Sequence, residues 1–99
     1  MELDEPTTVE ADPGWKFIIL NFRFTNNSIR VQDTPYISSG EIATDEGYIY
    51  SLLTSYSDTV GFEGLYQGES IEGFLTFQIP EGATPVEADL EHIDSLVRF

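Results

Sequence analysis

The sequence predicts an all-β domain, an antiparallel β-sandwich of about seven short strands. Residues 16–25 and 70–79 alternate apolar and polar side chains with the period of two that marks a half-buried strand. Between weaker strand-like segments, clusters of glycine, proline, asparagine and aspartate recur at intervals of roughly eight to twelve residues. No segment sustains the three- and four-residue apolar spacing of a helix. A small closed barrel is the alternative architecture.

The length of the chain and its lack of cysteine limit the size of the core and how it can be stabilised. Ninety-nine residues form one domain with one modest core. The absence of cysteine means that this core must hold without disulfides, and it excludes cysteine-ligated metals and thiol catalysis. Residues 1–12 carry five acids and no base, so we expect an acidic N-terminal tail there, with Thr7–Val9 as a candidate short edge strand. Residues 13–99 are expected to form the sandwich.

The first strong strand is expected over Lys16–Thr25, after a turn at Pro13–Gly14. Its inner face would carry four large apolar residues: Ile18, Leu20, Phe22 and Phe24. The beginning of the opposite face is apolar as well, at Trp15, Phe17 and Ile19. Another segment should therefore cover that face, and the N-terminal segment is the candidate.

The middle of the chain has weaker signals. Asn26–Ser28 is a turn cluster, followed by a short strand at Ile29–Gln32. Pro35 interrupts, and residues 36–44 resume in weaker β character. Asp45–Gly47 is expected to be a hairpin loop, because glycine can take a positive φ there. Residues 48–53 would then be the partner strand.

The second strong strand is expected over Ser70–Ile79, after a loop at residues 54–68. Its inner face would hold Ile71, Gly73, Leu75, Phe77 and Ile79, and Pro80–Gly82 would end it. Residues 86–90 and 95–99 are candidates for a final hairpin. We expect the two strong strands to pack against each other across the sandwich, which is of the immunoglobulin-like kind.

The net charge of −14 limits the partners that the domain can have. Eighteen acids outnumber four cations: Lys16, Arg23, Arg30 and Arg98. Nucleic acid is disfavoured because binding it relies on neutralising phosphates with lysine and arginine. Anionic membranes would repel the domain, and the longest apolar run, Phe17–Leu20, is too short to cross a bilayer. The acidity favours solubility, either of an ordinary secreted domain or of one from a high-salt habitat.

Three stretches resemble a family of bacterial and archaeal extracellular immunoglobulin-like domains of unknown function. They are Gly14–Asn27, Asp45–Tyr50 and Leu65–Pro80. That family is related in fold to a secreted mycobacterial immunoprotective antigen, and its members are often lipid-anchored. The sequence departs from the family pattern at Gln67, where proline is usual. The resemblance implies an extracellular or cell-surface location, with the leader or anchor not present in this chain, and it supplies no catalytic or ligand residues.

These observations predict a non-enzymatic interaction or structural domain with an unknown protein or cell-envelope partner. No catalytic, cofactor-binding or metal-ligating residue is assigned. Ser70 lacks the flanking glycine spacing of a nucleophile elbow, and a carboxylate pair for glycoside hydrolysis would need a deep cleft. His92, the only histidine, lies in an acidic run without an evident partner and is read as an exposed turn residue.

The alternative function is a calcium-dependent adhesion-type or ligand-binding module. Calcium prefers several oxygen ligands, and two acidic regions offer them: Asp45 and Glu46 on one hairpin, and Asp89, Glu91 and Asp94 near another. No Asp-x-Asp-x-Asp-Gly loop is present, and a solvated acidic face explains the same residues. A calorimetric titration with calcium separates the two functions.

Two further features have both a functional and an ordinary interpretation. Asn26 begins a formal N-glycosylation sequon, although Asn26–Ser28 suffices as a turn. Five tyrosines lie in the middle of the chain, and a cluster of them on one sheet face would be a candidate protein- or sugar-binding surface: Tyr36, Tyr48, Tyr50, Tyr56 and Tyr66. Placement at the sheet edges explains them as well.

Overall fold

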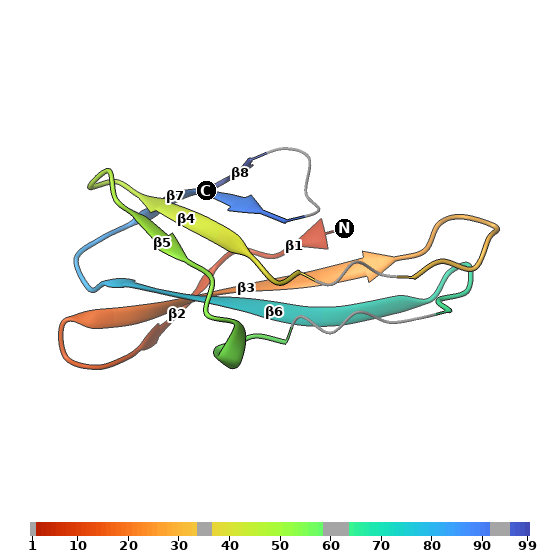
Figure 1. Cartoon of the computed structure of the whole chain (residues 1–99), viewed down its shortest axis with the longest axis horizontal. Coiled ribbons are helices and arrows are strands. Elements are labelled where there is room, and N and C mark those ends of the chain that lie inside the picture. The colour runs from red at the N-terminus through yellow and green to blue at the C-terminus, as the bar shows by residue number, and fades with distance from the viewer. Residues whose placement is uncertain (1, 34–36, 59–63, 92–95) are drawn as a thin grey trace.

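Two antiparallel sheets pack face to face in the computed structural model, which describes residues 2–33, 37–58, 64–91 and 96–99 (Figure 1). In the first sheet, β3 is central, with β6 on one side and β1 and β2 in turn on the other: β1 (Glu2–Leu3), β2 (Thr7–Glu10), β3 (Trp15–Thr25) and β6 (Ser70–Pro80). The second sheet has the order β5-β4-β7-β8: β4 (Gly40–Thr44), β5 (Ile49–Ser51), β7 (Pro85–Leu90) and β8 (Val97–Arg98).

The way the strands divide between the sheets confirms the predicted fold class. If β1 and β2 count as one interrupted strand, the first, second and fifth strands form one sheet. The third, fourth, sixth and seventh form the other. This is the division found in immunoglobulin-like sandwiches, with the fourth strand added to the second sheet as in variable-type domains. The chain is therefore an all-β antiparallel sandwich.

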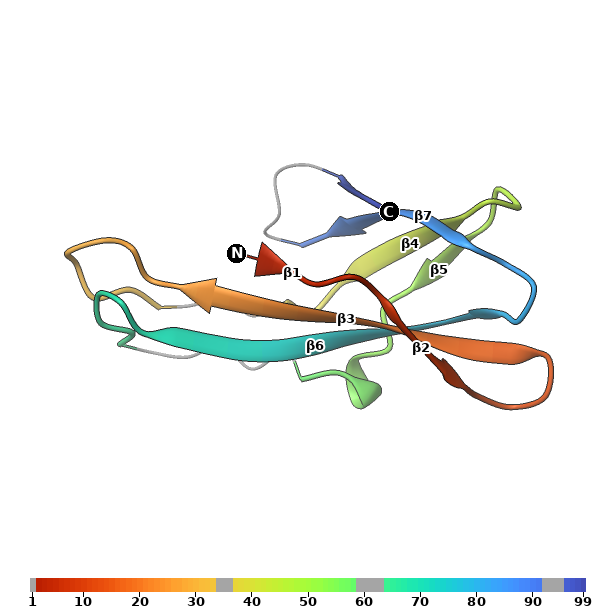
Figure 2. The same cartoon turned by 180° about the vertical axis from the view of Figure 1, so that it is seen from behind.

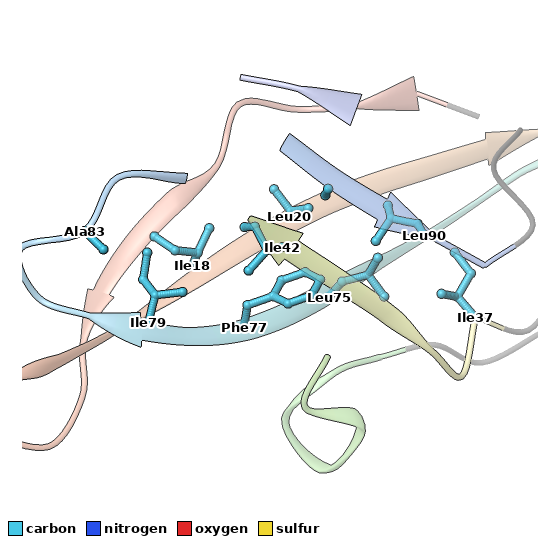
Figure 3. Packing of buried hydrophobic residues seen from close by; sticks show 10 residues of the cluster. Ile18, Leu20, Ile37, Ile42, Leu75, Phe77, Ile79, Ala83 and Leu90 are labelled. Carbon is cyan, nitrogen blue, oxygen red and sulfur yellow. The ribbon is translucent and has the colours of Figure 1, made fainter. Parts of the chain in front are cut away.

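The core lies between the sheets and is almost entirely aliphatic (Figure 3). Among the described residues, Phe77 is the one fully buried aromatic residue of this core, and it lies among Leu20, Leu75 and Ile42. The first sheet also contributes Ile18 and Ile79, and the second contributes Ala88 and Leu90. The inner faces expected for the two strong strands are thus the buried ones, because alternating side chains point to opposite faces of a strand.

The two strong strands do not pack across the sandwich, so that prediction was wrong. They are neighbours in one sheet, paired antiparallel from Trp15 with Pro80 to Thr25 with Ser70. Alternation specifies which side chains are buried, but both edges of a strand carry the same backbone groups. The pattern therefore does not determine whether two strands lie side by side or face to face.

The apolar outer face of β3 is covered by a segment other than the expected one. Residues 52–58, which contain the 3-10 turn η1 (Thr54–Tyr56), run along the outer edge of β6, and Tyr56 reaches this face from there. The Tyr56 ring lies 5.8 Å from the ring of Phe17, and the Tyr56 carbonyl accepts a hydrogen bond from Thr76 Oγ1 at 2.6 Å. The N-terminal segment pairs beside β3 through β1 and β2.

Two weaker predictions have different outcomes. Ile29–Gln32 is not a strand: Gln32 makes an isolated bridge to Leu65. The final hairpin forms as β7 and β8, which pair antiparallel. Among the described residues, no helix is long and apolar enough to cross a membrane.

β3 and β6 extend well beyond the second sheet as a two-stranded arm (Figures 1 and 2). Each has 11 residues, whereas the strands of the second sheet have at most 6. The molecule is accordingly elongated, with extents of 46 × 24 × 19 Å. Two loops meet at the end of this arm, residues 26–33 and 64–69, and we call them the arm tip.

Charge repulsion within the sandwich leads to a prediction about salt. Glu41 and Asp89 lie directly opposite each other on β4 and β7, an arrangement that destabilises a sheet. Salt shortens the Debye length from about 30 Å at 0.01 M to about 3 Å at 1 M. We expect the melting temperature to rise by roughly 5 °C or more between these NaCl concentrations, as a gain near 1 kcal/mol would give. Circular dichroism melts of the protein and of Glu41→Gln test this. The variant should show a smaller rise, and a constant or falling melting temperature would contradict the explanation.

Candidate functional site

The acidic residues considered for calcium lie at opposite ends of the second sheet. Asp45 follows β4, and its Oδ1 accepts a hydrogen bond from the Thr84 backbone N–H at 2.9 Å. Glu91 lies at the other end of β4, where its backbone N–H donates to the Ser39 carbonyl. The two acidic regions therefore cannot contribute ligands to a common ion.

The acids near Glu91 surround a polar hollow of about 490 Å³. Glu91 Oε2 already accepts hydrogen bonds from the backbone N–H and hydroxyl groups of Ser38 and Ser39, at 2.8 to 3.4 Å. Asp89 also lines this hollow, and Asp94 lies outside the described residues. Among the residues that are described, no three histidine, cysteine or acidic side chains are grouped so as to hold a metal ion. Calcium binding stays a prediction for titration.

The remaining candidate residues do not form a catalytic arrangement in the described part of the chain. The Ser70 hydroxyl is exposed and lies 2.7 Å from Thr25 Oγ1, with which it shares a hydrogen bond. His92 and Tyr36 lie outside the described residues. The four other tyrosines do not share a face. Tyr48, Tyr56 and Tyr66 are exposed in three separate places, whereas Tyr50 packs on the core and contacts the ring of Trp15.

Asn26 is the structural centre of the arm tip. Its side chain is fully buried, and Nδ2 donates hydrogen bonds to the carbonyls of Arg30 at 2.8 Å and Leu65 at 2.7 Å. Its Oδ1 accepts from the Ser28 backbone N–H at 2.8 Å, and its own backbone bonds to Gly68 and Glu69. Both amide hydrogens are thus engaged, which supports the turn interpretation of the sequon. One side chain ties the two loops together.

Further hydrogen bonds hold the two loops against each other. Gln32 and Leu65 exchange two backbone hydrogen bonds, and Leu65 itself is buried. Asp33 Oδ1 accepts from the Gly64 N–H across the two loops, and Glu69 Oε1 accepts from the Tyr66 N–H within the second loop. Gly64 and Gly68 have φ values of +75° and +85°, which other residues rarely adopt. The backbone of the tip is therefore strongly constrained.

This constrained backbone presents large apolar side chains to solvent. Ile29 is 86% exposed, Tyr66 65% and Val31 52%. The bridge between Gln32 and Leu65 brings the adjacent residues Val31 and Tyr66 alongside each other. Sequence reasoning assigned Ile29 and Val31 to a short strand and Tyr66 to a loop, and so did not group the three residues. The hydrogen bonds that bring the two loops together join residues that are more than 30 positions apart in the chain.

The tip also has much less net charge than the rest of the domain. One cation, Arg30, and two acids, Asp33 and Glu69, give it a net charge of −1 within a chain of −14. Both carboxylates accept backbone N–H groups within the tip. Low net charge together with exposed apolar and aromatic side chains resembles the composition at the centres of protein interfaces.

Fold and site together define a β-sandwich domain with an apolar, preorganised surface at the end of a two-stranded arm. Comparison with protein-family models, with curated proteins and with solved structures found no match for this chain. The family resemblance of the three sequence stretches therefore stays a prediction.

Proposed function

We propose that this protein is a non-enzymatic interaction domain of a secreted or cell-surface protein, and that the arm tip is the surface that binds its protein partner. The observation that carries the proposal is the exposure of Ile29, Val31 and Tyr66 on loops that Asn26 locks in place. An exposed apolar cluster is unfavourable in water, and it becomes favourable when a partner buries it.

Preorganisation supports this role. Ordering a flexible loop on binding costs conformational entropy, and loops that are already constrained avoid much of that cost. The position of the tip supports it as well, because immunoglobulin-like domains commonly bind through loops that a rigid sandwich gathers at one end. The acidity of the remaining surface would keep the domain soluble and repel acidic proteins.

The proposal predicts that the tip determines which proteins bind. Immobilised wild-type domain is exposed to secreted and cell-envelope fractions of the source organism, in parallel with Ile29→Ser/Tyr66→Ser. Loss of two exposed anchors should reduce retention of the specific partner at least about tenfold, as truncation of central interface residues does. Quantitative mass spectrometry of the retained proteins measures the difference.

Tyr48→Ser and Tyr56→Ser are the matched controls, because both tyrosines are as exposed as Tyr66 but lie away from the tip. They should retain the partner like the wild type. Equal losses in all variants, or no protein that distinguishes the wild type from the tip variant, would contradict the proposed function.

A further inference from the structure

The outer edge of β2 has backbone groups that pair with no described residue. Asp4 donates to the Asn21 carbonyl and Ala11 to the Trp15 carbonyl, so the odd-numbered residues of β3 bond toward β1 and β2. Because hydrogen bonding alternates along an antiparallel pair, Thr7 and Val9 face β3. The N–H and C=O groups of Thr8 and Glu10 therefore point away from the sheet, and no described residue pairs with them.

The opposite edge of the same sheet is protected. Asp58 and Phe74 exchange two backbone hydrogen bonds on the outer side of β6, and Leu53 donates to the Thr76 carbonyl. Natural proteins usually cover or shorten exposed strand edges, because such edges pair with other chains. Here residues 52–58 cover the edge of β6, while no described residue covers the edge of β2.

A groove of about 760 Å³ lies between the two sheets along the open edge. Leu3, Pro6 and Thr8 line it from the first sheet, and Val86, Val97 and Phe99 line it from the second. Val86 is 40% exposed and Phe99 43%, and the Phe99 N–H donates to the Val86 carbonyl, so the two residues lie side by side. Figure 2 shows the open edge from the front, with β1 and β2 of the first sheet below and β8 of the second sheet above them.

We infer that β2 accepts an extended segment of a partner protein as an additional strand. Thr8 and Glu10 would supply its main-chain hydrogen bonds. Alternate side chains of the segment would enter the groove beside Val86, Val97 and Phe99. Main-chain bonds from a sheet edge and pockets for alternate side chains are the two components of this binding mode.

Charge indicates what kind of segment fits. Residues 2–12, which form this edge, carry five acids and no base, whereas inside the groove the charges of Asp4 and Glu5 are balanced by Lys16 and Arg98. A second copy would bring the same acids together, which disfavours self-pairing. The segment should therefore have apolar residues at alternate positions in its centre and lysine or arginine at its ends. This inference shares the proposed role in protein binding but uses a separate surface.

Thr8→Pro is the discriminating variant. The Thr8 N–H points outward, so proline removes the donor and blocks an incoming strand without breaking the ladder to β3. Random peptides of about twelve residues displayed on phage are selected on the wild-type domain, with Thr8→Pro for counter-selection. We expect enriched peptides with alternating apolar centres and basic ends, whose affinity falls at least about tenfold in Thr8→Pro.

Three further measurements complete the test. Val86→Glu, which places a charge in the groove at a half-exposed position, should weaken the selected peptides as Thr8→Pro does. Peptide binding should slow hydrogen exchange at the amides of Thr8 and Glu10. Ile29→Ser/Tyr66→Ser should leave peptide affinity unchanged, which separates this site from the arm tip.

The inference is overturned if no peptide distinguishes the wild type from both variants, or if the enriched peptides are acidic. It is also overturned if sedimentation shows a wild-type dimer that Thr8→Pro dissociates, because the occupant would then be a second copy.

Discussion

Asn26→Ala should lower the free energy of unfolding by roughly 2–3 kcal/mol, because it leaves buried backbone groups at the arm tip without their partner. The Asn26 amide bonds to the Arg30 and Leu65 carbonyls and to the Ser28 N–H, and its side chain is fully buried. For a domain of this size such a loss lowers the melting temperature by roughly 10 °C or more. Chemical denaturation followed by circular dichroism measures it.

Two variants make the Asn26 prediction specific. Asn26→Asp keeps the shape and the acceptor for Ser28 but cannot donate to the two carbonyls, so it should be at least as destabilising as the alanine variant. Asn27→Ala alters the exposed neighbour and should change stability by less than about 0.5 kcal/mol. Similar losses in Asn26→Ala and Asn27→Ala would show that the hydrogen bonds of Asn26 do not hold the tip.

Gly73→Ala should destabilise the domain by roughly 1–3 kcal/mol, as overpacking of a well-filled site does. Gly73 lies opposite Phe22 in the register of β3 and β6. An added Cβ would lie 2.5 Å from Phe22 Cζ and 2.5 Å from the Asp58 carbonyl oxygen. The ring can rotate, but the Asp58 backbone is held by two hydrogen bonds to Phe74 and must be displaced.

Displacement of Asp58 has a second consequence, because residues 52–58 protect the edge of β6. Gly73→Ala should therefore also promote self-association, which analytical ultracentrifugation detects. Gly82→Ala is the matched control. Its Cβ meets no atom within 4 Å and its φ is not positive, so we expect a gain of about 0.4–1 kcal/mol from the stiffer unfolded chain. Equal effects at the two glycines would contradict the packing described at Gly73.

The buried faces of the two long strands could be predicted from the sequence, because burial on one face imposes a period of two on a strand. Leu20 and Phe77 were expected in the core and lie there. The neighbour relation of these strands was not predictable from alternation. Pairing depends on which edges meet, and the chain between β3 and β6 gives no local signal for it.

The arm tip shows the same limit of prediction at the proposed binding surface. Asn26, Asn27 and Ser28 are three ordinary turn residues, and nothing local indicates that Asn26 is the buried one. Its bond to the Leu65 carbonyl spans 39 residues. Likewise, Ile29 and Tyr66 belong to separate segments that come together only because β3 and β6 are paired along their full length. Local sequence patterns therefore do not predict a surface that is assembled from loops far apart in the chain.

Site-specific photocrosslinking tests the central claim, recognition through the arm tip, most directly. A benzophenone amino acid replaces either Tyr66, at the tip, or Tyr48, in the hairpin at the opposite end of the molecule; both side chains are 65% exposed (Figure 1). The proposal predicts a discrete crosslinked partner from position 66 only. Excess unlabelled wild-type domain should abolish this product, whereas Ile29→Ser/Tyr66→Ser domain should not. Equal crosslinking of the same partner from position 48, or none from position 66, would contradict recognition through the tip.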